Sequence, residues 1–400
     1  MEMTHPPIAH DRLATEFVGR RGPLFWLALR SAVLTLLTLG LYRFWMKTRL
    51  RRYYWSSVRP GGLPLEYVGE PMEKLLGFLI AVVILAFYIG IVNLALMFGS
   101  FAILHGNMAA YVLSFVGVIP IVFYARYRAR RYVLARTRWR GIRFGVEPGA
   151  WGYAWRALLH WATTLLTLGL LWPRMTFWLE KYRTDRTRYG ILRLHQGGRW
   201  TMLVPAYAHV LIGAVFSLLV LILPTLEGLP PLWPMLFVFV PWLLYGIVHY
   251  QVTATRILAD YKTAGGLRLS ARPRPWRVVR IYALGTALTV LGLVALLIVV
   301  AAVMVALFTA FGVTNIGRLL ETQDPPLWLT TAGAVAAYFA FFIALGVFRH
   351  VFLTLPLWRH YAETLAVAGT GQLSRVRQVP RDRHTEAEGF AEALDLGAAI

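Results

Sequence analysis

Three stretches of this 400-residue chain are long, apolar and free of Asp, Glu, Lys and Arg. A bilayer core requires about 20 mostly apolar residues per helical span. Each stretch meets or exceeds that length: Leu75 to Leu104, Thr201 to Leu226 and Tyr282 to Phe311. Hydrophobic residues make up 58% of the chain and charged residues only 15%, which is unlike a soluble domain. The sequence therefore predicts a membrane protein with several spans.

A seven-residue phrase, Thr-Leu-Leu-Thr-Leu-Gly-Leu, occurs twice, at 35–41 and at 164–170. Each copy ends an apolar segment and is followed by aromatic and basic residues, a Gly and a short alternating stretch. The offset between the copies is 129 residues (164 − 35), and the same offset maps Tyr53 on Tyr182 and Gly69 on Gly198. A constant period of this kind indicates internal duplication.

The net charge of +22 is concentrated in short blocks beside apolar segments. This is the pattern of cytoplasmic loops in membrane proteins. Only four of the 41 basic residues are Lys, and Arg interleaved with Trp and Tyr suits the lipid headgroup layer. The expected partner is therefore anionic membrane phospholipid and not nucleic acid.

The distribution of Lys and Arg predicts the topology. Five connections are strongly basic: 46–74, 126–150, 173–200, 251–280 and 349–383. Connections 105–107 and 227–231 contain neither Lys nor Arg, and 312–326 contains only Arg318. If the basic loops and the C-terminus are cytoplasmic in a bacterial inner membrane, the spans pair into three hairpins. The predicted spans are 75–100, 108–125, 201–226, 232–250, 281–311 and 327–348.

The segments 24–45 and 151–172, which contain the repeated phrase, have basic connections on both sides, so neither can cross once. We expect them to be re-entrant or interfacial, with Gly40 or Gly169 close to a break. Eight ordinary spans remain the alternative. Short alternating stretches also predict six strands, which we expect to pair into one small cytoplasmic sheet or barrel. These strands lie around 16–19, 63–67, 142–146, 191–195, 267–270 and 372–376.

The predicted fold class is an all-α polytopic membrane protein, with internal repeats of transmembrane hairpins, re-entrant or interfacial helices and a small cytoplasmic β element. A disordered N-terminus (1–16) precedes three repeats and a cytoplasmic C-terminal segment (351–400), whose tail is disordered from about residue 378. The repeats cover 17–125, 126–250 and 251–350.

Several of these features together resemble the YjgN-like family of bacterial inner-membrane proteins, a domain of unknown function. They are Phe17 and Gly19 in the first strand, the run from Thr38 to Trp45, the pair Arg52-Tyr53, and a strand that closes on Gly. The second copy departs from the pattern, with Trp172-Pro173-Arg174 where the first has Arg43-Phe44-Trp45. The resemblance implies a location and an architecture, and no chemistry.

Residues for catalysis or metal binding do not assemble from the sequence. The chain has no Cys, and its His residues lack metal-ligand spacing. Glu180, Asp185 and Asp260 lie in basic stretches, where we expect them to pair with neighbouring Arg residues. The sequence therefore predicts neither an enzyme, a cofactor nor a metal site.

Candidate binding residues are polar groups inside apolar segments. Arg156 and His160 are four residues apart, so on a helix they share a face that could bind a phosphate or carboxylate. Arg30 interrupts the first phrase segment similarly. Snorkelling of the Arg and hydrogen bonding of the His is the simpler reading. Asn93 and His209 lie deep in predicted spans, where they make helix contacts or line a pathway.

Two further groups of residues complete the predicted site set. A structural role at the break is expected for Thr38, Gly40, Thr167 and Gly169. A lipid-facing role is expected for Arg51, Arg52, Arg130 and Arg131. The first functional hypothesis is a transporter or channel-like protein for a small anionic solute or lipid, because transporters build sites from repeats and broken helices. The alternative is a non-transporting envelope protein that binds anionic lipid or scaffolds a membrane complex, and a homo-oligomer is left open.

Overall fold

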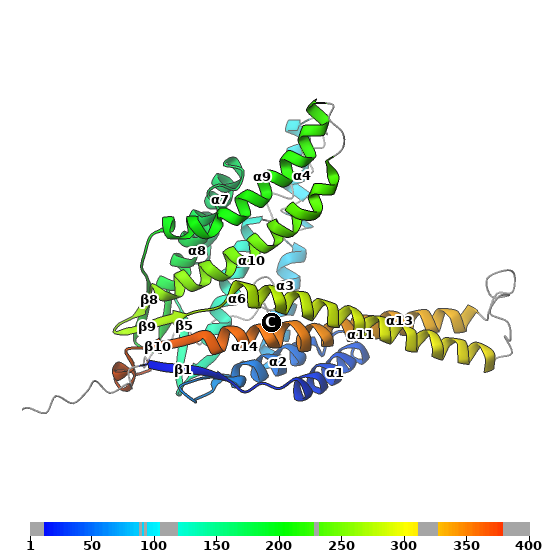
Figure 1. Ribbon diagram of the computed structural model, residues 1–400. Helices are drawn as coiled ribbons and strands as arrows, with labels where there is room; N and C mark the ends of the chain where they lie inside the picture. Colours follow the sequence, from blue (N-terminus) through cyan, green and yellow to red (C-terminus); the bar gives the residue numbers. More distant parts are fainter. Residues whose placement is uncertain are drawn as a thin grey trace, which may run out of the picture. The chain divides into compact units, whose positions relative to one another are not determined.

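The computed structural model describes residues 12–87, 90–91, 94–104, 119–227, 232–310 and 327–378 (Figure 1). The chain divides into two compact units. The first contains the chain up to Val18, Tyr54–Val278 and the chain from His360, and the second contains Gly19–Tyr53 and Val279–Arg359.

The first unit contains a ten-stranded antiparallel sheet, with the order β2-β1-β10-β9-β8-β7-β6-β5-β4-β3. The two end strands, β2 and β3, are consecutive in the chain, are joined by residues 61–64 and contact each other. The sheet therefore curls until its ends meet. The strands are β1 (Arg12–Phe17), β2 (Val58–Pro60), β3 (Leu65–Tyr67), β4 (Thr137–Trp139), β5 (Ile142–Val146), β6 (Thr187–Tyr189), β7 (Leu192–Gln196), β8 (Lys262–Ala264), β9 (Leu267–Ala271) and β10 (Leu365–Ala368).

Tight turns connect neighbouring strands at one edge of the sheet, where edge means the side on which one set of strand ends lies. Trp139 of β4 pairs with Ile142 of β5, so the turn consists of Arg140 and Gly141 alone. Both turn residues have positive φ, 53° and 74°, as a type I′ hairpin requires. The β6–β7 and β8–β9 turns are equally short, because Tyr189 pairs with Leu192 and Ala264 pairs with Leu267.

Helices connect neighbouring strands at the opposite edge. Val146, near the end of β5, pairs with Thr187, at the start of β6, although 40 residues separate them (147–186). The same holds for Phe17 with Val58, Tyr67 with Thr137, Gln196 with Lys262, and Ala271 with Leu365. Because each of these strand pairs is antiparallel, every helical excursion leaves and re-enters the sheet at the same edge.

Five helical excursions therefore rise from one edge of the sheet. In chain order they are α1 (Arg21–Leu37) with α2 (Arg43–Ser57); α3 (Pro71–Phe87), α4 (Leu94–Leu104) and α6 (Ile119–Ala135); α7 (Ala150–Leu166) with α8 (Trp172–Asp185); α9 (Val204–Glu227) with α10 (Leu236–Asp260); and α11 (Pro275–Ala310), α13 (Leu327–Phe348) and α14 (Leu355–Thr364). Short helical turns are η2 (Trp200–Leu203), η3 (Trp233–Met235), the π-helical η4 (Arg349–Thr354) and η5 (Thr370–Arg375).

Within the described residues, four helices are long and apolar enough to cross a membrane: Trp200–Pro224, Trp233–Asp260, Pro275–Ala310 and Thr330–Thr364. They coincide with four of the six predicted spans. The other two, 75–100 and 108–125, fall partly on residues outside the described chain. The connections at 105–107 and 312–326, and most of the one at 227–231, also lie outside it.

The inner face of the curled sheet is an apolar core. Trp139, Tyr189, Leu267 and Val367 are buried there, and Leu373 beside η5 packs against them. Tyr189 donates its hydroxyl hydrogen to the carbonyl of Trp139 (3.0 Å), and burial raises the pKa of Tyr189 to about 12. The ring of strands is thus a packed element and not an open channel.

The structure corrects three predictions about the β element. The chain is not all-α, since the predicted small element is a ten-stranded sheet. The predicted strand at 372–376 is wrong, because left-handed Gly369 (φ 80°) ends β10 and η5 follows. The disordered N-terminus at 1–16 is wrong for residues 12–16, which belong to β1, while residues 1–11 lie outside the described chain.

The four-residue β10 was not predicted, and neither were four shorter strands: β2, β4, β6 and β8. Each has three residues, too few to show alternation, and each has a charged or polar residue at its centre. Four predicted strands are confirmed within a residue or two: 63–67, 142–146, 191–195 and 267–270 correspond to β3, β5, β7 and β9.

Candidate functional site

Both copies of the repeated phrase form the same turn between two helices. Thr38 donates its hydroxyl hydrogen to the carbonyl of Leu34 (2.8 Å) and accepts the amide of Tyr42 (2.9 Å). Thr167 makes the equivalent contacts, with Thr163 (2.9 Å) and with Leu171 (3.4 Å). Each threonine therefore ties the end of one helix to the start of the next.

The turn has the hydrogen bonds of a Schellman motif, which ends helices with a left-handed residue. Gly40 donates its amide to the carbonyl of Thr35, and Leu39 to that of Leu36. The left-handed position, usually Gly, is here Leu39 (φ 51°) and in the second copy Leu168 (φ 48°). A left-handed conformation costs an L-residue roughly 1–2 kcal/mol. Gly40 and Gly169 follow with φ of 92° and 88°.

A loop at the start of α7 is held by two buried tyrosines. Tyr127 of α6 donates to the carbonyl of Glu147 (2.7 Å), and Tyr182 of α8 donates to that of Gly149 (2.9 Å). Burial, together with Tyr182, raises the pKa of Tyr127, so its hydroxyl remains a donor. The loop between these contacts directs the first turn of α7 towards α6.

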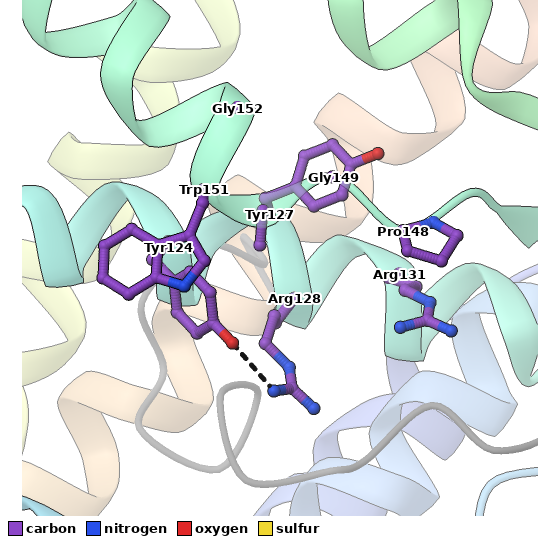
Figure 2. Close-up of a pocket in the computed structure, with 9 residues that line it drawn as sticks. Tyr124, Tyr127, Arg128, Arg131, Pro148, Gly149, Trp151 and Gly152 are labelled. Atoms are coloured by element: carbon purple, nitrogen blue, oxygen red, sulfur yellow. Dashed lines mark hydrogen bonds between the residues drawn. The ribbon is translucent and has the colours of Figure 1, made fainter.

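A surface pocket of about 290 Å³ lies where α6 meets this turn. In Figure 2, the rings of Tyr124 and Trp151 lie at one end, Arg131 and Pro148 at the other, and Arg128 between them. Arg128 donates to the hydroxyl of Tyr124 (3.0 Å), and the rings of Tyr124 and Trp151 are 4.7 Å apart. The pocket thus combines an aromatic wall with two guanidinium groups.

The electrostatics of this pocket favour an anion. The first amides of a helix have no intrahelical acceptor and carry partial positive charge. In the described structure no side chain caps α7, and its first turn contains no acidic residue. The Nε atom of Arg131 is buried and has no hydrogen-bond partner among the described residues. A phosphate or carboxylate would supply the missing acceptor and charge.

Arg156, predicted from the sequence, lies beside this pocket. It donates to the carbonyl of Gly152 (3.0 Å), a lining residue, and its guanidinium carbon is 4.9 Å from the centre of the Tyr182 ring. The carbonyl of His160 instead accepts the hydroxyls of Thr163 and Thr164, one turn further along α7. Arg30 is exposed on α1, in the other unit. The predicted trio is therefore not brought together within one unit.

A buried ion-pair cluster joins α8 to the sheet. Glu180 lies between Lys262 of β8 (Nζ–Oε1, 2.6 Å) and Arg183 (Nη2–Oε2, 2.6 Å), and its side chain is 15% exposed. Burial by itself would raise the pKa of Glu180. The cations Lys262, Arg183 and Arg130 outweigh that effect and lower the pKa well below its usual range. Glu180 is thus an ionised structural carboxylate.

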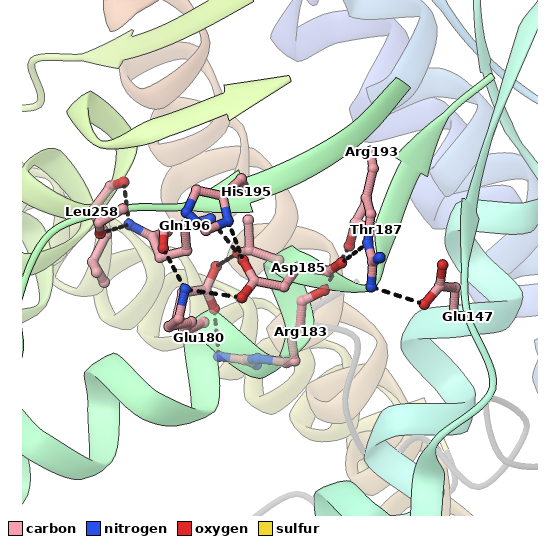
Figure 3. A network of polar contacts seen from close by, with 12 residues as sticks. Glu147, Glu180, Arg183, Asp185, Thr187, Arg193, His195, Gln196 and Leu258 are labelled. Carbon is pink, nitrogen blue, oxygen red and sulfur yellow. Dashed lines mark hydrogen bonds and ion pairs between the residues drawn. The ribbon is translucent and has the colours of Figure 1, made fainter. Parts of the chain in front are cut away.

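The polar network continues along the edge of the sheet (Figure 3). Asp185 accepts the amide of Gln196 (2.8 Å) and pairs with Lys181 (3.0 Å). Glu147 pairs with Arg188 and, at 3.3 Å, with Arg193. These contacts join the helix ends to β6 and β7, so the pocket loop is anchored on the sheet.

The remaining predicted residues have varied positions. His209 of α9 packs against the ring of His249 in α10, with ring centres 4.8 Å apart, which is a helix contact. Asn93 lies outside the described residues. Of the four basic residues expected to face lipid, Arg52 is exposed, whereas Arg51 is buried (1% exposed). Arg130 lies close enough to influence Glu180, and Arg131 lines the pocket.

Sequence reasoning missed most of the pocket. Its α6 residues, Tyr124, Tyr127, Arg128 and Arg131, follow the i, i+3, i+4, i+7 spacing of one helix face. That spacing is a usable signal, but of these four residues only Arg131 was predicted, as a lipid-facing residue. The contribution of Trp151 and of the α7 amides depends on the fold of the loop and could not be predicted.

A family model described as "Bacterial protein of unknown function (DUF898)" matches residues 12–394. The chain belongs to the DUF898 family. This confirms the resemblance found from the sequence. The inner membrane protein YjgN of Salmonella typhimurium strain LT2 is 29% identical over 140 residues. That alignment covers 34% of this chain and 33% of the relative. No solved structure matches. The four apolar helices and this relative support a bacterial inner-membrane location.

Proposed function

We propose that this protein binds anionic phospholipid of the inner membrane, with a headgroup phosphate held in the pocket between α6 and α7. One observation carries the proposal: Arg128, Arg131 and Tyr124 line one pocket together with the uncapped first turn of α7. Guanidinium groups and helix amides are strong donors to phosphate. The rings of Tyr124 and Trp151 suit the layer between headgroups and acyl chains.

The proposed topology places this pocket at the cytoplasmic headgroup layer. All helical excursions leave the sheet at one edge, so the tight turns at the other edge lie on the far side from the membrane. Because basic connections are retained in the cytoplasm, we assign the sheet and the C-terminus to that side.

An internal repeat is part of the same proposal. Tyr53 donates to the carbonyl of Arg20 (2.7 Å), and Tyr182 makes the equivalent bond to Gly149, 129 positions later. Thr35 contacts the sulfur of Met46 (4.0 Å), and Thr164 contacts that of Met175 (3.9 Å). These matching contacts support duplication of the helical hairpin.

Transport of a small anionic solute, the first hypothesis from the sequence, stays a prediction. A flux assay in proteoliposomes tests it directly: flux that is unchanged by Arg156→Ala would remove Arg156 from any transport site. The lack of enzymatic activity likewise stays a prediction.

Native mass spectrometry of the purified full-length protein tests lipid binding. The protein is extracted, exchanged into detergent and titrated with phosphatidylglycerol or phosphatidylethanolamine. A basic residue near anionic headgroups contributes about 1 kcal/mol, so the double change Arg128→Gln, Arg131→Gln should weaken phosphatidylglycerol binding roughly thirtyfold. Arg126→Gln is the matched control, because Arg126 is exposed on the same helix and does not line the pocket.

Equal affinity of the double variant and the Arg126→Gln control would contradict the proposal. Inorganic phosphate is then added at millimolar concentration to the unmodified protein and to the double variant. Displacement of phosphatidylglycerol from the unmodified protein but not from the double variant would indicate that the pocket binds a free anionic solute and not a lipid. Preference for the zwitterionic over the anionic lipid would also contradict it.

A further inference from the structure

The two Thr-Leu-Gly-Leu turns place leucine where protein structure favours glycine. In both copies the left-handed position is occupied by Leu, and the glycine comes one residue later. Leu39 is 95% exposed and Leu168 is 93% exposed, so neither side chain is stabilised by packing against the described residues. In water this arrangement combines backbone strain with an exposed apolar side chain. An apolar environment outside the protein would stabilise it.

The surroundings of each turn have the same character. No Asp, Glu, Lys or Arg occurs between Arg30 and Arg43 or between Arg156 and Arg174. The ionisable side chains in these two stretches are Tyr42 and His160. Further exposed leucines flank both turns: Leu37, Leu41, Leu166 and Leu170. Aromatic pairs stand beside them, with Tyr42 stacked on Trp45 (6.0 Å) and Trp161 against Trp172 (5.4 Å). Exposed leucines with aromatic and Arg neighbours are typical of segments at a membrane interface.

The sheet limits how far each turn reaches. The α1–α2 hairpin starts at β1 and returns to β2, and the α7–α8 hairpin starts at β5 and returns to β6; both strand pairs are hydrogen-bonded. Neither hairpin can therefore end on the opposite side of a membrane. Arg43 and Arg174, in the first turns of the returning helices, keep that part of each hairpin at the headgroups.

We propose that each Thr-Leu-Gly-Leu turn is a wedge that inserts Leu39 or Leu168 into the upper acyl region of a single leaflet, without crossing the bilayer. The partner of this surface is lipid hydrocarbon. Each wedge would occupy area in the leaflet that it enters and none in the other. The inference rests on the membrane location and not on phosphate binding in the pocket.

Depth-dependent fluorescence quenching tests the wedge, and the absence of Cys makes labelling specific. Leu39→Cys, Leu168→Cys and the control Ile191→Cys, which is 52% exposed in the β6–β7 turn, are each labelled with an environment-sensitive fluorophore. The full-length proteins are reconstituted in vesicles of phosphatidylethanolamine and phosphatidylglycerol. A nitroxide near the glycerol end of the acyl chain should quench positions 39 and 168 more than one near the chain end, and should leave position 191 unquenched.

Quenching of positions 39 and 168 no greater than that of position 191 would overturn the proposal. Maximal quenching by the nitroxide near the chain end would also overturn it, since a spanning segment would then be indicated.

A second measurement separates insertion from a purely local role of leucine. The labelled position is moved to Leu41→Cys or Leu170→Cys, and Leu39→Gly or Leu168→Gly is added. Glycine adopts the left-handed conformation without strain, so the turn should still form. Loss of the leucine should lower acyl quenching at the neighbouring label about twofold, because apolar area is removed from the inserted surface. Unchanged quenching would show that the leucine is not an anchor. Lipid affinity of the pocket should be unaffected in these variants, so the two proposals fail independently.

Discussion

Glu180 illustrates how a single residue holds this protein together. Its two carboxylate oxygens pair separately with Lys262 and Arg183, each at 2.6 Å. Lys262 belongs to β8, so the contact joins α8 to a strand that is far away in sequence. Breaking a largely buried pair by removing one partner leaves the other charge without compensation, which costs more than the pair contributes.

Glu180→Gln should therefore destabilise the protein by about 3 kcal/mol, because Lys262 and Arg183 lose their counter-charge while remaining largely enclosed. Thermal unfolding of the detergent-solubilised protein measures the effect. Glu66→Gln is the matched control, since Glu66 is exposed in β3 and should be nearly neutral. A melting temperature for Glu180→Gln equal to that of the control would contradict this role.

The lowered pKa of Glu180 also predicts a pH dependence with a definite sign. A carboxyl whose folded pKa lies below its ordinary value of 4.5 stabilises the fold fully above that pH. The contribution is lost as the pH falls below 4.5 towards the folded pKa, because the unfolded chain then takes up the proton first. The melting temperature should thus decrease between pH 6 and pH 3 by less in Glu180→Gln than in the unmodified protein. Parallel profiles would contradict the assignment, since the other carboxylates are common to both.

Sequence reasoning predicted part of this cluster. The expectation that Glu180 pairs with a neighbouring Arg is met by Arg183, three residues away, whereas Asp185 pairs with Lys181, four residues away. Lys262 could not be predicted, because its contact depends on the pairing of β7 with β8. Local periodicity carries no information about such a contact.

At the level of elements, α9 and α10 form a close helical hairpin through small residues. A Cβ atom added at Gly246 would lie 2.8 Å from the backbone of His209, and one at Gly213 would lie 2.7 Å from the Cα atom of Leu243. Backbone cannot move aside as a side chain can. The two glycines therefore permit the approach that packs His209 against His249.

Gly246→Ala should separate α9 from α10 and destabilise the protein by about 2 kcal/mol, the range for overpacking a close contact. Gly346→Ala in α13 is the control, because nothing lies within 4 Å of its added methyl group and alanine favours a helix. The melting temperature in detergent distinguishes them: a fall for Gly246→Ala with no fall for Gly346→Ala is expected. A similar effect of both would indicate a general sensitivity of membrane helices to methyl groups.

Apolar length and the repeated phrase were sufficient to predict the four confirmed helices and the breaks near Gly40 and Gly169. They were insufficient for the sheet. Three-residue strands such as Thr137–Trp139 follow directly on the basic helices, and only the two-residue turns show them, for example Arg140-Gly141. The hairpin turn was a readable signal, whereas the closure of β2 on β3 depends on the whole set of pairings.

At the scale of the whole molecule, the ring of strands determines which segments share a side. Every helical excursion begins and ends at one edge, and the tight turns occupy the other. Positions in different tight turns, though far apart in sequence, must then be accessible from the same side of the membrane. Exposed positions of this kind are Leu63, Ile191 and Ser374, whereas Met235 directly precedes α10, at the end of that helix far from the sheet.

Single-cysteine accessibility tests this sidedness most directly. Leu63→Cys, Ile191→Cys, Ser374→Cys and Met235→Cys are made in the Cys-free chain and treated with a membrane-impermeant maleimide in intact spheroplasts. The account predicts labelling of position 235 alone, and labelling of the other three only after the membrane is permeabilised. Labelling of any of positions 63, 191 or 374 in intact spheroplasts would contradict a single sheet on the cytoplasmic side.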